Sequence, residues 1–428
     1  MVSPISTILQ NNWGFEMLLR RVAVCCLVVA NAWAADQSKP GEGNQRAMQL
    51  AADSPLVESA RVYLMRQASR IQDAKLRANT QELLTNSDFC IASRVGVTAE
   101  RKDELLKQLL AEGLLAPGME KAAFTGVFPV LRDEAAACPK MPQSYGSAPG
   151  SSFGGHHSHP GGLALHAAFN LTNGLQLARG YRQIYGSSRV DGMPVVAAVV
   201  DGTSDVFLSE DLMIAAPIWH DWAKIMVFQW NADGTEFSEF NFGGNGKTDA
   251  WGGAGDSRTG AHHILGAAEG IMRGLPAEFV ITVMSAHAAP TGGNEYKVVN
   301  WIRTASILAG VDPVAAGYLK KDSQGRFRLA ALRRLGEKSN LLSEYVLHHL
   351  SDADFVFTGP AATTVDQLLK ELAQKFGVDR TNITTFNNQF RNPVLAYLSV
   401  ERLMLLYGNG GMDAVEKEIQ TIRSRLKL

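Results

Sequence analysis

The stretch Ala215-Ala216-Pro217-Ile218-Trp219-His220-Asp221-Trp222-Ala223-Lys224 ends an apolar run with a His-Asp pair and a lysine three residues later. At helical spacing, neighbouring side chains lie about 100° apart, so His220 and Asp221 can both reach one ion at a helix end. Lys224 follows one turn later, beside both of them. Because Pro217 lacks an N–H group, it is expected to kink this helix or to start it afresh.

Most histidines of the chain lie around this pair. Eight of the ten fall between His156 and His287, a concentration that core packing alone does not explain. They stand at the start or end of segments that are expected to be helical. Imidazole and carboxylate ligands on several facing helices are the usual way in which a helical bundle builds a metal site. The sequence therefore predicts a metal site at helix ends.

This region carries four motifs. In chain order they are His-His-x-x-Pro-Gly-Gly-Leu-x-x-His (156–166), His-Asp-x-x-Lys (220–224), His-x-x-x-Gly-Ala (262–267) and the single His287. Their types and order resemble the motifs of the HD-domain metal-dependent phosphohydrolases, from about residue 154 to residue 310. The distance to the Gly-Ala pair matches His262 rather than His263 to the histidine of that family.

The resemblance implies a site and a reaction. Five side chains would bind one or two divalent ions, with the aspartate able to bridge: His166, His220, Asp221, His262 and His287. A water molecule activated by the metal would attack the phosphorus of a small phosphate ester, of the nucleotide or cyclic nucleotide class. Asp221 and Lys224 would be the catalytic residues. Manganese, iron, magnesium, zinc and nickel are not distinguished by these residues.

The role of Lys224 has two interpretations. It would bind the phosphate or protonate the leaving oxygen, or it is a helix-surface lysine paired with an acid. Further substrate contacts are expected from His156 and His157 in a loop over the site, unless this turn is merely rich in histidine. Residues 228–260 are rich in aromatic residues and glycine. This composition predicts a surface hairpin or a lid over the metal site. Its candidate contacts are Lys247, Asp256 and Arg258.

One position departs from the family. There, an Ala-Asp pair on a later helix completes the first metal site, whereas this chain has Ser306 after Ala305. Serine is a poor ligand compared with a carboxylate. Asp312 lies nearby, but its surroundings are typical of a helix N-cap. Two other functions stay open: a di-iron oxygenase, because some HD-domain proteins activate oxygen with these ligands, and a non-catalytic metal- or ligand-binding module, which Ser306 favours.

The first 34 residues are predicted to be a signal peptide, although an uncleaved anchor is the alternative. Arg20-Arg21 precedes an apolar stretch, and Ala32-Trp33-Ala34 provides the small-x-small cleavage pattern. Met17 is a more usual start than Met1 for such a peptide. We therefore expect export, to the periplasm or outside the cell, with no transmembrane segment in the mature chain. In an oxidising compartment, Cys90 and Cys138 form one disulfide or remain two buried thiols.

The composition indicates a globular chain. It has 428 residues, of which 46% are hydrophobic, and its 41 basic and 42 acidic residues do not indicate a nucleic-acid partner. We expect a mostly α fold with a small hairpin or glycine-rich insertion. An N-terminal helical region with a linker (35–150), an HD-type helical bundle (151–312) and a C-terminal helical region (313–428) are predicted. In the last region, His348 and His349 are interpreted as surface or packing residues, and no chemistry is predicted. The oligomeric state is not indicated.

Overall fold

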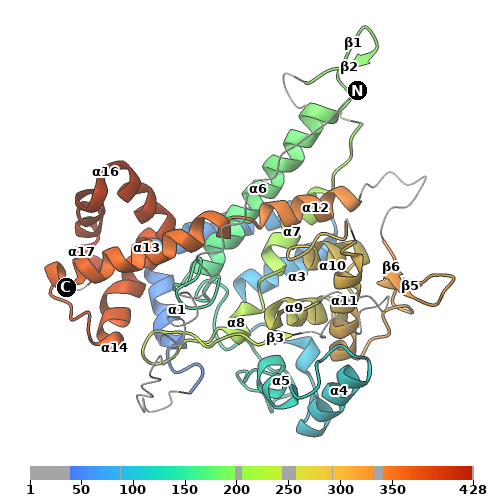
Figure 1. Cartoon of the computed structure of the whole chain (residues 1–428), viewed down its shortest axis with the longest axis horizontal. Helices are drawn as coiled ribbons and strands as arrows, with labels where there is room; N and C mark the ends of the chain where they lie inside the picture. Colours follow the sequence, from blue (N-terminus) through green and yellow to red (C-terminus); the bar gives the residue numbers. More distant parts are fainter. Residues whose placement is uncertain are drawn as a thin grey trace, which may run out of the picture. The chain divides into compact units, whose positions relative to one another are not determined.

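The computed structural model describes residues 39–86, 88–197, 205–242, 257–291, 293–331 and 341–426. Within these ranges the chain is mostly helical, and its short strands form only two-stranded antiparallel pairs (Figure 1). The predicted mostly α fold class is therefore confirmed. The predicted signal peptide lies outside the described residues. Among the described residues, no helix combines the length and the apolar character needed to cross a bilayer.

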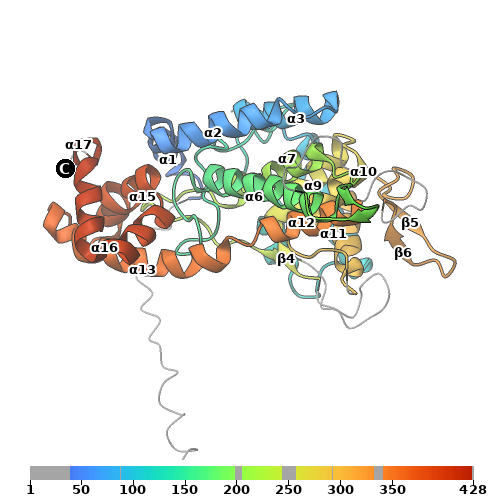
Figure 2. The ribbon, with the colours of Figure 1, turned by 90° about the horizontal axis from the view of Figure 1, so that it is seen from above.

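The N-terminal region consists of helices that pack on the rest of the chain. They are α1 (Asn44–Asp53), α2 (Pro55–Ala68), α3 (Ala74–Thr85), α4 (Ala99–Ala111) and α5 (Glu120–Val127). The start of α2 is set locally, because Ser54 Oγ accepts a hydrogen bond from the Val57 amide at 3.2 Å. Figure 2 shows α2 and α3 lying along α6 and α7, with which they are in contact.

The central region contains the helices that carry the histidine motifs. They are α6 (Gly162–Tyr185), α7 (Glu210–Trp219), α8 (Lys224–Val227), α9 (Ala261–Met272), α10 (Ala277–Met284) and α11 (Glu295–Ala309). Ser209 caps α7 through its hydroxyl group, and Pro217 lies in the last turn of that helix. The proline therefore neither restarts nor divides α7, which ends at Trp219 and leaves the His-Asp pair in the turn that follows.

The described strands form three two-stranded antiparallel pairs between helices. The pairs are β1 (Arg189–Val190) with β2 (Met193–Pro194), β3 (Asn241–Phe242) with β4 (Thr259–Gly260), and β5 (Leu319–Lys321) with β6 (Phe327–Leu329). In the predicted hairpin region a turn at Asp233 and Gly234 precedes β3. The remaining part of the predicted lid, with Lys247 and Asp256, lies outside the described residues.

The C-terminal region consists of helices and one π-helical turn. They are α12 (Leu341–Ser351), α13 (Phe355–Ala373), α14 (Ile383–Thr385), the π-helical turn (Phe386–Arg391), α15 (Asn392–Leu398), α16 (Val400–Thr421) and α17 (Arg423–Leu426). Figures 1 and 2 show α13 to α17 gathered beside the other helices. Helix α12 instead packs against α6, α7 and α10.

Two hydrophobic cores result from this arrangement. The first contains side chains from Ala51 to Leu347, and the second contains side chains from Ala361 to Leu426. The first core therefore combines the predicted N-terminal region, the predicted bundle and α12. Residues 150 and 312, the predicted boundaries, do not separate one core from another.

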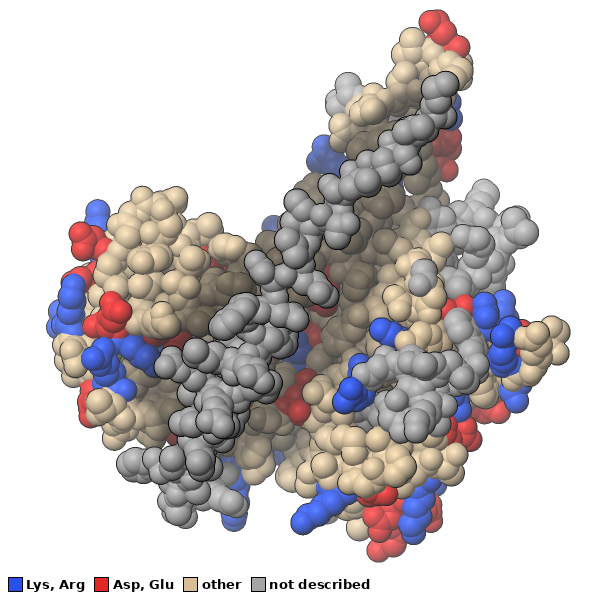
Figure 3. Space-filling model, viewed as in Figure 1, with Lys and Arg blue, Asp and Glu red and all other residues tan. Residues whose placement is uncertain are grey.

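Cys90 and Cys138 form a disulfide, with their Cα atoms 5.4 Å apart. It joins the segment after α3 to the segment after α5, where Cys90 also bridges the backbone of Lys140. Of the two interpretations that the sequence left open, the structure has the disulfide. On the face shown in Figure 3, basic and acidic side chains are interspersed.

Candidate metal centre

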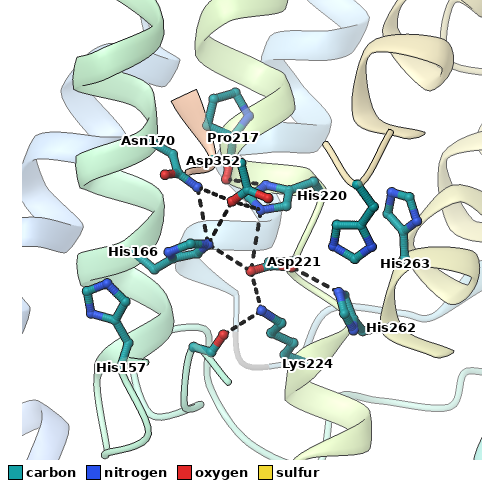
Figure 4. A network of polar contacts seen from close by, with 12 residues as sticks. His157, His166, Asn170, Pro217, His220, Asp221, Lys224, His262, His263 and Asp352 are labelled. Carbon is teal, nitrogen blue, oxygen red and sulfur yellow. Dashed lines mark hydrogen bonds and ion pairs between the residues drawn. The ribbon is translucent and has the colours of Figure 1, made fainter. Parts of the chain in front are cut away.

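Asp221 lies at the centre of a group of histidines from three helices (Figure 4). Its Oδ2 atom is 3.1 Å from His166 Nε2, on α6, and 3.4 Å from Nε2 of the adjacent His220. Its Oδ1 atom is 3.0 Å from Nε2 of His262, which lies on the first turn of α9. The two carboxylate oxygens of Asp221 therefore point to two different sets of histidines.

Three groups of described side chains could each hold a metal ion: a group of His156, His157, His166 and Asp354, and two groups that share Asp221. Of the two that share Asp221, one contains His166, His220 and Asp221, and the other contains Asp221, His262 and His287; within each group the ligand atoms lie within 4.8 Å of one another. Because Asp221 belongs to both of these groups, it is placed to bridge two ions. The predicted ligand set is thus brought together by the fold.

A further carboxylate, which the sequence interpretation missed, contacts two histidines of the group formed by His166, His220 and Asp221. Asp352 Oδ1 is 3.1 Å from His166 Nε2 and 3.2 Å from His220 Nε2, and it also accepts a hydrogen bond from Asn170 at 2.8 Å. Asp352 follows the end of α12, so residues 313–428, for which no chemistry was predicted, supply a carboxylate to the candidate centre. A signal was present in the sequence His-His-x-x-Asp-x-Asp, which ends an amphipathic segment at residues 348–354.

Ser306 does not stand at the position of a missing carboxylate. It is buried on α11 and lines a separate cavity of about 570 Å³ together with Asp312. Asp312 is exposed and accepts hydrogen bonds from the amides of Val314 and Ala315, as an N-cap residue does. The interpretation of Ser306 is corrected because helix packing, and not order along the chain, decides which carboxylate reaches the histidines.

Several buried polar atoms at the centre form no hydrogen bond and only lie close to one another or to Asp352. They are His220 Nε2, His262 Nε2 and Asp221 Oδ1. Leaving such atoms buried and unpaired costs free energy, so natural proteins pair nearly all of them. Here the unpaired atoms are imidazole nitrogens and a carboxylate oxygen that converge on one place. This donor set fits a divalent transition metal, although it does not identify the ion.

The orientation of two histidines is set by acceptors behind them. His220 Nδ1 is 3.1 Å from the Pro217 carbonyl oxygen, and His262 Nδ1 is 2.5 Å from Glu239 Oε1. Because these oxygens can only accept, Nδ1 carries a proton, and Nε2 is the atom that can donate a lone pair to a metal ion once it is deprotonated. Such partners fix the tautomer and raise the basicity of a metal-binding histidine.

Asp354 has the same role for His166. The Nδ1 atom of His166 is 3.2 Å from the Asp354 carboxylate, which also accepts a hydrogen bond from His157 Nε2 at 2.8 Å. His157 is buried behind the centre and does not line its cavity, whereas His156 does. Of these two histidines, both predicted as substrate contacts, only His156 lines the cavity.

Steric crowding explains why the first motif has two glycines after its proline. A Cβ atom on Gly162 would lie 1.8 Å from the carbonyl oxygen of His157, and Gly161 has a φ of +92°. A residue with a side chain therefore fits neither position without a shift of the backbone. The two glycines allow the histidine loop to fold closely over the start of α6.

A cavity of about 370 Å³ opens at the centre. The described residues that line it are His156, His166, Asp221, Lys224, Ala286, His287, His349, Leu350, Asp352, Ala353 and Phe355. Lys224 is buried and contacts both Asp221 and the Gly150 carbonyl oxygen, so it is not a surface lysine. Arg258, by contrast, is exposed and is not among these residues.

Two histidines interpreted as surface or packing residues lie at the centre. His348 is fully buried, and its ring packs edge-on against that of His220 with the centroids 5.1 Å apart. His349 lines the cavity, and its Nδ1 atom donates a hydrogen bond to the Ala286 carbonyl oxygen at 2.6 Å. His263 points to the Val283 carbonyl oxygen, away from Asp221.

The charged side chains at the centre shift one another's pKa values. Burial by itself lowers the pKa of His220, but the negative charges of Asp221 and Asp352 outweigh it and raise this pKa to about 9. Burial raises the pKa of Asp221, yet His220 and Lys224 hold it well below its usual value. In the metal-free protein at neutral pH, Asp221 is therefore ionised and His220 is protonated.

The centre is interpreted from its own geometry, because no family model, curated protein or solved structure matches the chain.

Proposed function

We propose that the protein is a metal-dependent phosphohydrolase that cleaves a small phosphate ester. The observation that carries the proposal is the convergence of buried donor atoms of His220 and His262 on Asp221, which itself lines an open cavity. A lysine and further histidines line the same cavity, as the binding of a phosphate group requires. The resemblance of the four sequence motifs to those of HD-domain phosphohydrolases supports the same reaction.

The side chains divide into two sets. His166, His220 and Asp352 would hold one ion, His262 and His287 would hold the other, and Asp221 would contact both. Divalent ions held in this way supply an activated water molecule as nucleophile and neutralise charge on the phosphoryl oxygens. The chain itself holds the ligand geometry through the acceptors behind His166, His220 and His262.

Lys224 and His349 would act on the substrate. The ammonium group of Lys224 is held at the cavity by the Gly150 carbonyl oxygen and can bind a phosphoryl oxygen. The Nδ1–H group of His349 donates to Ala286 in the neutral and in the protonated imidazole alike, so the proton that is exchanged is on Nε2. Histidine is the side chain that most often acts as a general acid in enzymes. We therefore assign to His349 the protonation of the leaving oxygen.

The His349→Asn variant tests this assignment. The asparagine amide can still donate to the Ala286 carbonyl oxygen, but it has no proton to transfer. We expect kcat/KM for an alkyl phosphate ester to fall by about 100-fold, the usual contribution of a general acid. For the 4-nitrophenyl ester, whose leaving group needs no proton, the loss should be much smaller. Equal losses on both esters, at unchanged metal content, would contradict this role.

Metal binding should release protons. His220 is protonated below pH 9 in the metal-free protein, and a metal ion binds only the deprotonated imidazole. Affinity should therefore rise with pH, by about tenfold per unit and per proton displaced, between pH 6 and pH 8.5. Calorimetric titrations in two buffers of different ionisation enthalpy count the protons. A pH-independent affinity without proton release would show that these histidines are not the ligands.

The function as a whole is tested on the purified protein. Elemental analysis gives the bound metal, and a panel of phosphate monoesters and diesters gives the activity, with and without a chelator. Metal-dependent release of phosphate or alcohol supports the proposal. Iron-dependent consumption of oxygen without phosphate release would instead select the di-iron oxygenase, and metal binding without either activity would select a binding module.

A further inference from the structure

We propose that the substrate is amphiphilic, with a phosphate head at the metal centre and a long apolar tail that lies along α6. This inference rests on the proposed function and names its substrate class. It starts from a second cavity, of about 470 Å³, between α6 and the end of α12. Leu350 lines both cavities, so the two adjoin at this side chain.

The two cavities differ in chemistry. The metal-centre cavity contains histidines, aspartates and a lysine. The described residues that line the second cavity are all uncharged; Asn173 and Gln176 are polar, and the larger side chains are Leu177, Tyr181, Ile184, Tyr185 and Leu350. We call this second cavity the trough. A charged site beside an uncharged, largely aliphatic and aromatic trough matches a ligand with a charged head and an apolar tail.

Several apolar side chains beside the two cavities are exposed to solvent. Leu350 is 47% exposed, Ile184 is 50% exposed and Tyr185 is 67% exposed. Phe355, at the metal-centre cavity itself, is 53% exposed. Neighbouring exposed apolar side chains of this size usually mark a binding site, because leaving them in water forgoes the free energy of burial.

The length of α6 suits an extended tail. His166 and Ile184 lie 18 residues apart on this one helix, which corresponds to about 27 Å at 1.5 Å per residue. Figure 1 shows the outer part of α6 extending past α7 and α12 toward the β1–β2 hairpin. The trough therefore leads away from the metal centre along a single straight element, as an acyl or prenyl chain would require.

Binding of alkylphosphonates to the metal-loaded protein tests the inference without turnover. Methyl-, butyl-, octyl- and dodecylphosphonate have the same head, so their affinities report on the tail alone. We expect the affinity to rise with chain length, by up to about fourfold for each buried methylene group. The experiment is done below the micelle concentration of each compound, with calorimetry as the measurement.

The double variant Ile184→Ser, Tyr185→Ser removes apolar surface from the trough. We expect the ratio of dodecyl- to methylphosphonate affinity to fall by about tenfold, because fewer methylene groups are then buried. Val62→Ser, on the exposed side of α2, is the matched control, since Val62 is 50% exposed like Ile184 and lies outside both cavities. This variant should keep the ratio of the unchanged protein.

The other outcomes separate the two proposals. If methylphosphonate binds only with metal but longer chains bind no better, the tail is overturned and the phosphohydrolase proposal stands. If no phosphonate binds and no ester is hydrolysed, both proposals fail. If the double variant keeps the affinity ratio but changes the sedimentation of the protein, the trough is a contact between copies, and the tail is again overturned.

Discussion

The Asp221→Asn variant is expected to lose both metal binding and hydrolysis. One oxygen of Asp221 faces His166 and His220, and the other faces His262, so this carboxylate serves both ions. An amide is neutral and a weaker ligand, and its loss of charge acts on two sites at once. Mutation of outer partners of a ligand already costs roughly 10- to 100-fold in affinity, so a larger loss is expected here. Activity should fall on the order of 1,000-fold.

Asparagine has nearly the shape of aspartate, so the fold should persist. Lys224 would lose its carboxylate partner but keep the Gly150 carbonyl oxygen. We therefore expect a lower melting temperature with an unchanged helical circular dichroism spectrum. Elemental analysis and phosphate release are the measurements, with the exposed Asp312→Asn as control. Full metal content and full activity in Asp221→Asn would show that the metal centre is wrongly assigned.

The second large effect is expected from Asp352→Asn. Asp352 is the carboxylate that reaches both His166 and His220, which Asp221 also contacts. Removing its charge should lower the affinity for the ion at His166 and His220 by about 100-fold or more. The affinity of the site at His262 and His287 should change less. A metal titration followed by calorimetry should then show one weakened step and one step that is nearly unchanged.

Ser306→Asp is the matched comparison, because it adds a carboxylate where sequence order suggested one. Ser306 is fully buried and its hydroxyl group has no hydrogen-bond partner, so an ionised carboxylate there would be desolvated and unpaired. We expect the protein to be destabilised by several kcal/mol, without any gain in metal affinity. Tighter metal binding in Ser306→Asp, together with unchanged binding in Asp352→Asn, would reverse the assignment.

Local spacing determined much of the centre from the sequence alone. The adjacent His220 and Asp221, the lysine one turn later and the choice of His262 over His263 depend on which side chains share a helix face. That relation is fixed by helical geometry within a few residues. The mostly α fold follows in the same way from apolar periodicity and capping residues such as Ser54 and Ser209.

Tertiary packing alone decided the remaining members of the centre. Asp354 lies 188 residues after His166 in the chain, and Asp352 only two residues earlier, yet both contact that histidine. No local pattern encodes this contact, because it depends on α12 packing against α6 and α7. The same packing places His349 at the metal-centre cavity and Ser306 at a separate cavity. Helix faces can be read within a few residues, but the partner of each face is chosen by the burial of the whole core.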